Sequence, residues 1–147
     1  HSLEQYTIHA GRSIPNIWSI GGFSLSENTA YACEPFVTTE QGGGFVRNGK
    51  IKNIFAINSR KKTKNEEADK LLNFIWENFN MLPFALRWIT KEWEEKKARE
   101  LLDILIKKKA VQAYPVLIEV NEQRVAQAEH TFIPTESGVT VTTKALA

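Results

Sequence analysis

The chain has 147 residues, 42% of them hydrophobic, and a formal net charge of +2 at pH 7. This length and apolar content are enough for one sizeable hydrophobic core. No run of eighteen apolar residues and no signal-like N-terminus occur, so we expect a cytoplasmic protein with no membrane partner. Cys33 is the only cysteine, which excludes a disulfide within the chain.

Residues 1–58 carry β-strand signals broken by glycines. Asn48-Gly49 lies between two strand-like stretches and predicts the turn of a β-hairpin. The run Gly42-Gly43-Gly44 is followed by neither Lys-Ser/Thr nor a helix signal. It therefore predicts a flexible turn and not a phosphate-binding loop.

Glu34 lies within the apolar, strand-like run 30–37. A carboxylate in a buried strand is unfavourable unless it is paired or bound to a cation. Pro35 also permits an edge strand in which Glu34 faces water, so both interpretations remain open. We expect Cys33, in the same run, to be a small core residue.

Residues 60–109 have the pattern of amphipathic helices. Thr63 to Glu66 matches a capping box at the start of a helix, and Pro83 suits the first turn of a short helix through Trp88. Two apolar faces repeat at helical spacing. They are Ala68, Leu71, Leu72, Ile75 and Phe79, and then Ala98, Leu101, Leu102, Leu105 and Ile106.

The same block is basic, with 13 Lys and Arg against 9 Asp and Glu. Its lysine runs are Lys61-Lys62, Lys96-Lys97 and Lys107-Lys108-Lys109. Such clusters attract phosphates and allow contact with ribosomal RNA, but a solvated helix surface has the same composition. Both readings stay open at this point.

The last third returns to strand signals, at residues 114–120, 124–133 and 138–143. An antiparallel sheet edged by helices is the expected product. Glu129 lies inside the apolar second strand, and His130 follows it directly. Because side chains alternate along a strand, we expect His130 on the opposite face from Glu129, in a structural role.

Six short motifs, in order along the chain, resemble those of type II methionine aminopeptidases, most closely the archaeal enzymes. The motifs span nearly the whole sequence, which makes the set far more specific than any one of them. They are residues 1–11 (HSLEQYTIHAG), 13–16 (SIPN), 32–36 (ACEPF), 82–88 (LPFALRW), 113–117 (AYPVL) and 126–131 (AQAEHT).

The resemblance implies an α+β fold, the second half of the pita-bread (creatinase/aminopeptidase) fold, with a curved antiparallel sheet, helices and a type II helical insertion. It divides the chain into the first part of a catalytic half-domain (1–59), the helical insertion (60–112) and the C-terminal strands (113–147). Type II enzymes are about twice this length, and the chain begins with His1 instead of Met. We therefore expect a preceding N-terminal half.

By the same resemblance, His1, Glu34 and Glu129 are ligands of two divalent metal ions, with Co, Mn, Fe or Zn all acceptable. Glu34 is also the catalytic group that accepts a proton from the nucleophile. His9 is the second catalytic residue, which binds the substrate backbone and stabilises the oxyanion. A purely structural histidine is the alternative for His9.

The resemblance also implies a methionine-binding pocket. Its substrate-binding residues are Ile8, His9, Phe36, Pro83 and Tyr114, although ordinary core packing explains Pro83 and Tyr114 equally well. Two residues near the ligands depart from the family pattern. Ala128 stands where a Phe is usual, and Cys33 stands where an aliphatic residue is usual.

The implied function is removal of the initiator methionine from nascent proteins, with a peptide carrying an N-terminal Met as substrate. The N-terminal half would supply two Asp ligands and a His, and we expect this chain to be inactive without it. Two alternatives remain. One is a metal-free pita-bread homologue that binds RNA or protein, and the other is an Xaa-Pro peptidase of the same fold.

Overall fold

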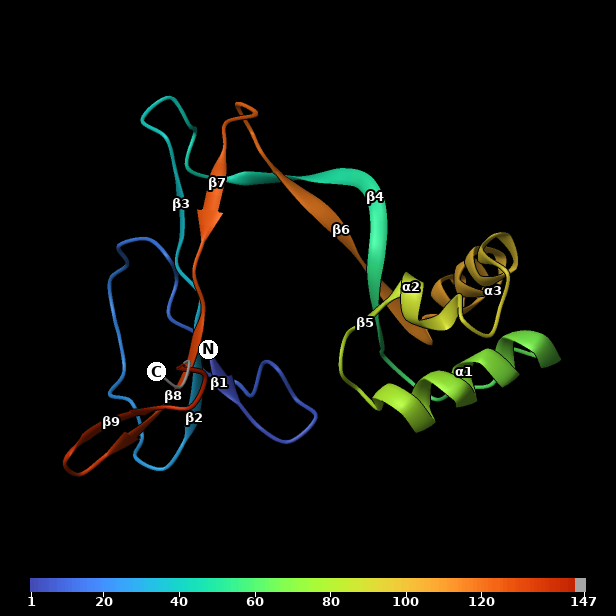
Figure 1. Ribbon diagram of the computed structural model, residues 1–147, viewed down its shortest axis with the longest axis horizontal. Coiled ribbons are helices and arrows are strands. Elements are labelled where there is room, and N and C mark those ends of the chain that lie inside the picture. The colour runs from blue at the N-terminus through green and yellow to red at the C-terminus, as the bar shows by residue number, and fades with distance from the viewer. Residues whose placement is uncertain (145–147) are drawn as a thin grey trace. The chain divides into compact units, whose positions relative to one another are not determined.

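The computed structural model describes residues 1–144, which form two compact units (Figure 1). The first unit contains His1–Val46 and the described part of Glu119–Ala147, and the second contains Arg47–Ile118. No helix of the described chain is long and apolar enough to cross a membrane. Each unit has its own sheet structure.

The first unit is built from antiparallel strands. A four-stranded sheet has the order β1-β2-β8-β9, and β3 pairs separately with β7. The strands are β1 (Ser2–Leu3), β2 (Ala30–Cys33), β3 (Phe36–Thr38), β7 (Val125–Gln127), β8 (His130–Thr135) and β9 (Gly138–Val141).

The β2/β8 and β3/β7 ladders keep one register across a short break. Cys33 lies opposite His130, and Phe36 lies opposite Gln127, so the two residues between them on each strand also face each other. Pro35 lies in this gap and has no N–H to donate, although its carbonyl accepts a hydrogen bond from Ala128 N at 3.3 Å. The single strand predicted over 124–133 is therefore divided into β7 and β8.

The second unit combines three helices with a three-stranded sheet in the order β5-β4-β6. Its elements are β4 (Val46–Ile57), α1 (Glu66–Phe79), β5 (Phe84–Ala85), α2 (Leu86–Ile89), α3 (Glu95–Lys107) and β6 (Val111–Glu119), the outer ends of β4 and β6 belonging to the first unit. The apolar faces predicted from the sequence form the core: Ala68, Leu71, Leu72 and Ile75 of α1 pack with Ala98, Leu101, Leu102 and Leu105 of α3.

The start of α1 differs by two residues from the predicted capping box. Asn65 is the N-cap, and its side chain accepts a hydrogen bond from Ala68 N at 3.0 Å. Thr63 instead holds the preceding turn, accepting from Asn65 N at 3.1 Å and donating to Asp69 Oδ1 at 2.9 Å. Both side chains thus satisfy polar groups at the helix entrance.

The hairpin predicted at Asn48-Gly49 is wrong, because β4 runs unbroken through both residues. Gly49 serves a different purpose there. A Cβ at this position would lie 2.8 Å from Val116 O and 3.0 Å from Ile118 Cδ1, both on the neighbouring strand β6. The glycine therefore permits close approach of two strands instead of a turn.

The prediction that Pro83 opens a short helix is also wrong. Phe84 and Ala85 first pair with β4, at Phe55 and Ile54, and only then does α2 begin. The backbone at Ala85 is extended, so the helix starts at Leu86, three residues after the proline. Pairing with β4 has outweighed the local helix signal.

Glu119 connects the turn between β3 and β4 with the turn after β6 through hydrogen bonds. The side chain is 4% exposed, and its oxygens accept hydrogen bonds from the backbone of Gly43, Asn121 and Gln123. Burial raises the pKa of the Glu119 carboxyl, but backbone donors led by Gln123 and Gly43 outweigh burial and hold this pKa below its ordinary value. Glu119 thus stabilises the fold as a carboxylate.

This lowered pKa predicts a specific loss of stability in acid. The contribution of Glu119 is complete above its ordinary pKa of 4.5 and declines as the pH falls through the lower value of the folded state. We expect Glu119→Gln to lower the melting temperature at pH 7, with the deficit shrinking below pH 4.5. Melting curves at pH 7, 4 and 3 test this, with the exposed turn residue Glu136→Gln as control; a deficit independent of pH would contradict it.

Candidate active site

His1 extends the pairing of β1 with β2. Its amino group donates to Ala32 O at 2.9 Å, and Ala32 N donates to His1 O at 2.8 Å. This pair continues the register in which Ser2 lies opposite Tyr31. The imidazole is therefore carried by a two-stranded ladder that includes β2, the strand leading to Glu34.

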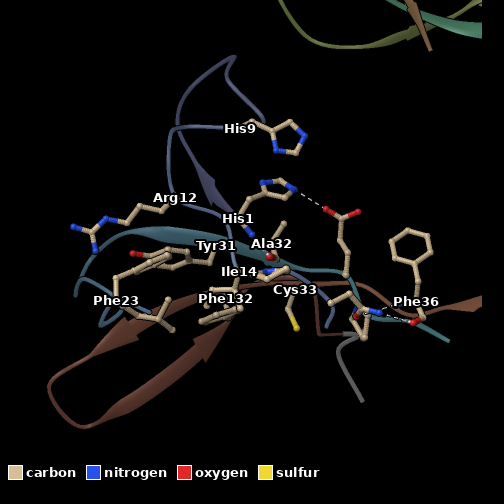
Figure 2. A pocket seen from close by; sticks show the side chains of 15 residues that line it. His1, His9, Arg12, Ile14, Phe23, Tyr31, Ala32, Cys33, Phe36 and Phe132 are labelled. Carbon is tan, nitrogen blue, oxygen red and sulfur yellow. Dashed lines mark hydrogen bonds and ion pairs between the residues drawn. The ribbon is translucent and has the colours of Figure 1, made fainter. Parts of the chain in front are cut away.

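His1 and Glu34 are in direct contact. His1 Nε2 lies 2.6 Å from Glu34 Oε1, and both side chains are largely shielded from solvent, at 15% and 29% exposure. The His9 ring lies above His1, with ring centroids 4.1 Å apart and a 46° tilt (Figure 2). His1 Nδ1 is buried and has no hydrogen-bond partner in the described chain. Two imidazoles and a carboxylate thus meet at one place.

Glu34 and Glu129 occupy facing positions of the continuous register described above. They lie one residue beyond the Cys33 and His130 pair, in the gap before β3 and β7. By alternation, Glu34 shares a face with Ala32, and Glu129 shares that face from the opposite strand. The same rule puts Cys33 and His130 on the other face.

Cys33 does lie on the side away from His1, where its side chain points in the opposite direction (Figure 2). It is exposed, so the expectation that it is a core residue is wrong. The cause is local, because Cys33 is the last residue of β2 and the ladder opens immediately after it at Pro35. His130 is likewise exposed, and its Nδ1 lies 3.1 Å from Thr143 Oγ1.

Glu129 does not join the contact between His1 and Glu34. Its side chain is exposed and accepts a hydrogen bond from Gln127 Nε2 at 3.4 Å. Within residues 1–144, no group of three or more His, Cys, Asp or Glu side chains is arranged to hold a metal ion. The structure therefore brings two of the three predicted ligands together and leaves the third, Glu129, outside their contact.

A pocket of about 440 Å³ adjoins this contact, and all its lining residues belong to the first unit. Three of them are predicted site residues besides Glu34, namely His1, His9 and Phe36. The lining also includes apolar side chains that the sequence did not single out as site residues: Ile14, Phe23, Leu25, Tyr31 and Phe132. The alternation of side chains along β2 and β8 was the sequence signal that could have identified Tyr31 and Phe132 as pocket residues. Their rings stack with centroids 5.7 Å apart.

The segment between β1 and β2 forms one wall of this pocket although it has almost no regular structure. Arg12 fixes it to the sheet, because Arg12 N donates to Ser2 Oγ at 3.1 Å and its guanidinium donates to Ser24 O at 3.0 Å. The guanidinium also lies 5.0 Å from the centre of the Phe23 ring. Asn16 Nδ2 donates to Phe36 O at 2.7 Å, which ties the segment to β3.

The other predicted substrate-binding residues do not line this pocket. Ile8 is half-buried in the first unit, next to His9. Pro83 and Tyr114 belong to the second unit, where the Tyr114 hydroxyl accepts a hydrogen bond from Gln112 Nε2 at 2.6 Å. Their roles in substrate binding stay predictions.

The sequence is similar to archaeal proteins named methionine aminopeptidase. It is 38% identical over 144 residues to the one from Methanocaldococcus jannaschii, covering 98% of this chain and 47% of that protein. It is 38% identical over 149 residues to the one from Saccharolobus solfataricus, covering 99% of this chain and 48% of that protein. The chain thus spans about half the length of the curated relatives it matches. No protein-family model matches it.

The structure is similar to a solved structure of a thermophilic Arx1, with a TM-score of 0.71 and 18% sequence identity. The likeness covers 82% of this chain and 32% of that chain. At this identity the likeness concerns the fold alone. Together with the sequence relatives it confirms the expected α+β, pita-bread half-fold.

Proposed function

We propose, from the premise that the chain is a homologue of the methionine aminopeptidases, that it supplies part of the active site of an enzyme removing the initiator methionine from nascent proteins. The observation that carries the proposal is the 2.6 Å contact between His1 Nε2 and Glu34 Oε1. The relatives' name supports the choice of reaction, and this contact supports the choice of site.

The residues present fit part of a metal site. His1, Glu34 and Glu129 offer imidazole nitrogen and carboxylate oxygen, which Mn, Fe, Co and Zn all accept. His1 Nδ1 is buried and has no hydrogen-bond partner within residues 1–144, so this imidazole has unused bonding capacity. We propose that these three side chains would hold two divalent metal ions. When bound, the ions would lower the pKa of a water molecule and polarise the scissile carbonyl.

The chain's own groups would bind, orient and move a proton. Glu34, which lines the pocket, would accept the proton from the attacking water at one of its Oε atoms. His9 is exposed beside His1 and would donate a hydrogen bond to the substrate carbonyl oxygen as negative charge develops there. Phe36 and the apolar wall would bury the unbranched methionine side chain, with dispersion and burial as the main attraction.

We also propose that this chain acts with an N-terminal half carrying two Asp ligands and a His. The relatives it matches are about twice as long, and only two of the three predicted ligands in this chain converge. Three ligands would leave two metal ions under-coordinated. We place the reaction in the cytoplasm, where proteins are synthesised.

A complementation assay tests this function. The chain is purified alone and together with a polypeptide that supplies the N-terminal half, and methionine release from Met-Ala-Ser is measured with Co²⁺ or Mn²⁺ present. We expect release only from the combined preparation. Release by the chain alone would contradict the need for a second half. Cleavage of Xaa-Pro peptides in preference to Met-Ala peptides would instead favour the prolidase alternative.

A further inference from the structure

A groove of about 530 Å³ lies within the second unit. One wall is formed by β4, at residues 50–53 and Phe55, and the other by α3, at residues from Arg99 to Ile106. The groove shares no residue with the pocket beside His1 and Glu34. It is therefore a separate candidate for binding a ligand.

The groove follows the edge of β4 and not one of its faces. Asn53 faces α3, because its Oδ1 accepts a hydrogen bond from Arg99 Nη2 at 3.3 Å. By alternation, Ile51 shares this face, whereas Lys50 and Lys52 point to the opposite face. Residues of both faces line the groove, and none of its described lining residues belongs to β6. The wall is therefore the edge of β4 that faces away from β6.

This edge of β4 has room for another strand. The order β5-β4-β6 places β5 on it, but β5 pairs with β4 only at Ile54 and Phe55. A longer β5 would continue opposite residues 50–53, but the chain turns into α2 at Leu86 instead. Within residues 1–144, no strand pairs with this edge at 50–53. Backbone N–H and C=O groups along this free edge, about 13 Å long, are therefore available to a partner.

The charges along the free edge favour an acidic partner. Lys50 and Lys52 are exposed and form no ion pair within the described chain. Asp103 is the one acidic residue among the described residues that line the groove, and Arg99 is already paired with Glu95 at 2.8 Å. Lysines on an edge strand also repel a second copy of the same strand. The edge thus disfavours self-pairing and favours a strand that carries carboxylates.

The side of the free edge toward α3 is apolar. Ile51 is 60% exposed on this side. Two apolar residues of α3 line the same groove, namely Leu102, which is buried, and Ile106, which is partly buried against the core. Because side chains alternate along a strand, an added strand would present every second residue to this apolar side and the others to the lysines.

We propose that the free edge of β4 binds an extended segment of another polypeptide by strand addition, and that acidic and apolar residues alternate in this segment. Backbone hydrogen bonds to residues 50–53 would supply affinity, and the alternating side chains would supply specificity. Two acidic residues would lie near Lys50 and Lys52, and the apolar residue between them would lie near Ile51 and Ile106. This proposal is independent of the aminopeptidase function.

Fluorescence anisotropy of a labelled peptide of about eight residues, in which Glu alternates with Val, tests the proposal when the full chain is titrated into it. The control peptide has the same composition, with Glu and Val in separate blocks. We expect the block peptide to bind at least roughly tenfold more weakly. N-methylation of one alternate set of backbone amides should abolish binding, and methylation of the other set should not, because only every second N–H of an added strand points to its neighbour.

The edge variant combines Lys50→Glu with Lys52→Glu. We expect it to bind the Glu-Val peptide roughly tenfold more weakly than the unmodified chain, and to bind a Lys-Val peptide instead. Binding of the Lys-Val peptide would also show that the variant is folded. The control variant, Lys91→Glu with Lys96→Glu, makes the same change of charge at exposed residues of the second unit outside the groove, and should keep its affinity for the Glu-Val peptide.

Four results would overturn the proposal. They are no binding of the Glu-Val peptide by the full chain, equal losses in the two variants, equal effects of the two sets of methylated amides, and loss of peptide binding when the N-terminal half is added. The last result would mean that the N-terminal half itself covers the free edge of β4.

Discussion

Replacing Glu34 by Gln is expected to lower methionine release by the complemented enzyme roughly 10²–10⁴-fold, the usual range for loss of a general base. The substitution keeps the size of the side chain and removes its charge. We therefore expect the structural change to be confined to the contact between Glu34 and His1. Because Glu34 is also proposed as a metal ligand, metal binding gives a second measurement of its role. We also expect weaker metal binding, measured as Co²⁺ content and as the visible absorption of the Co²⁺-loaded protein.

Glu40→Gln is the matched control, since Glu40 lies exposed in a turn of the same unit. It should leave both activity and metal content unchanged. Activity of the Glu34 variant within about twofold of the unmodified enzyme would remove Glu34 from the mechanism. Loss of activity with full retention of both metal ions would limit its role to that of the base. Glu129→Gln should also reduce Co²⁺ content, and an unchanged content would exclude it as a ligand.

Ile75→Ala is expected to lower the free energy of unfolding of the second unit by about 2–5 kcal/mol. Ile75 is fully buried between α1 and the rest of the apolar core, so shortening it removes contacts and leaves a cavity. Urea unfolding followed by tryptophan fluorescence measures the change. Three tryptophans report on this unit, namely Trp76, Trp88 and Trp93.

Glu77→Ala, on the exposed side of the same helix, is the comparison variant and should change stability by no more than about 0.5 kcal/mol. An equal effect of both substitutions would show that helix propensity, and not core packing, dominates this unit. A loss below about 1 kcal/mol for Ile75→Ala would mean that the core collapses around the cavity. Neither substitution touches a predicted ligand.

Helices were the most predictable part of the fold, because their apolar spacing is a local signal. The apolar faces around Leu71 and Leu101 both form part of the core. The errors arose where a distant strand overrides a local signal. Gly49 resembles a turn residue but faces β6, and Phe84 pairs with β4 before α2 can begin.

The candidate site was predictable from motifs and only partly from physical patterns. A buried-strand argument treated Glu34 and Glu129 alike, yet Glu34 contacts His1 while Glu129 remains exposed. Pro35 signalled an edge or interrupted strand, but the sequence did not show that β2 would end at Cys33 and leave this residue exposed. The sequence did not predict that the segment around Arg12 forms a wall of the pocket, because a segment without regular secondary structure has no hydrophobic periodicity.

The register shared by β2/β8 and β3/β7 has a consequence for folding kinetics. Glu34 and Glu129 are far apart in sequence, so closing the loop between them directly carries a large entropy cost. The second unit lies entirely within that loop and has its own core. Once it has folded, the remaining free loop is short, and β3 can pair with β7 at a lower entropy cost. Assembly of the two glutamates should therefore follow the formation of a unit that contains neither of them.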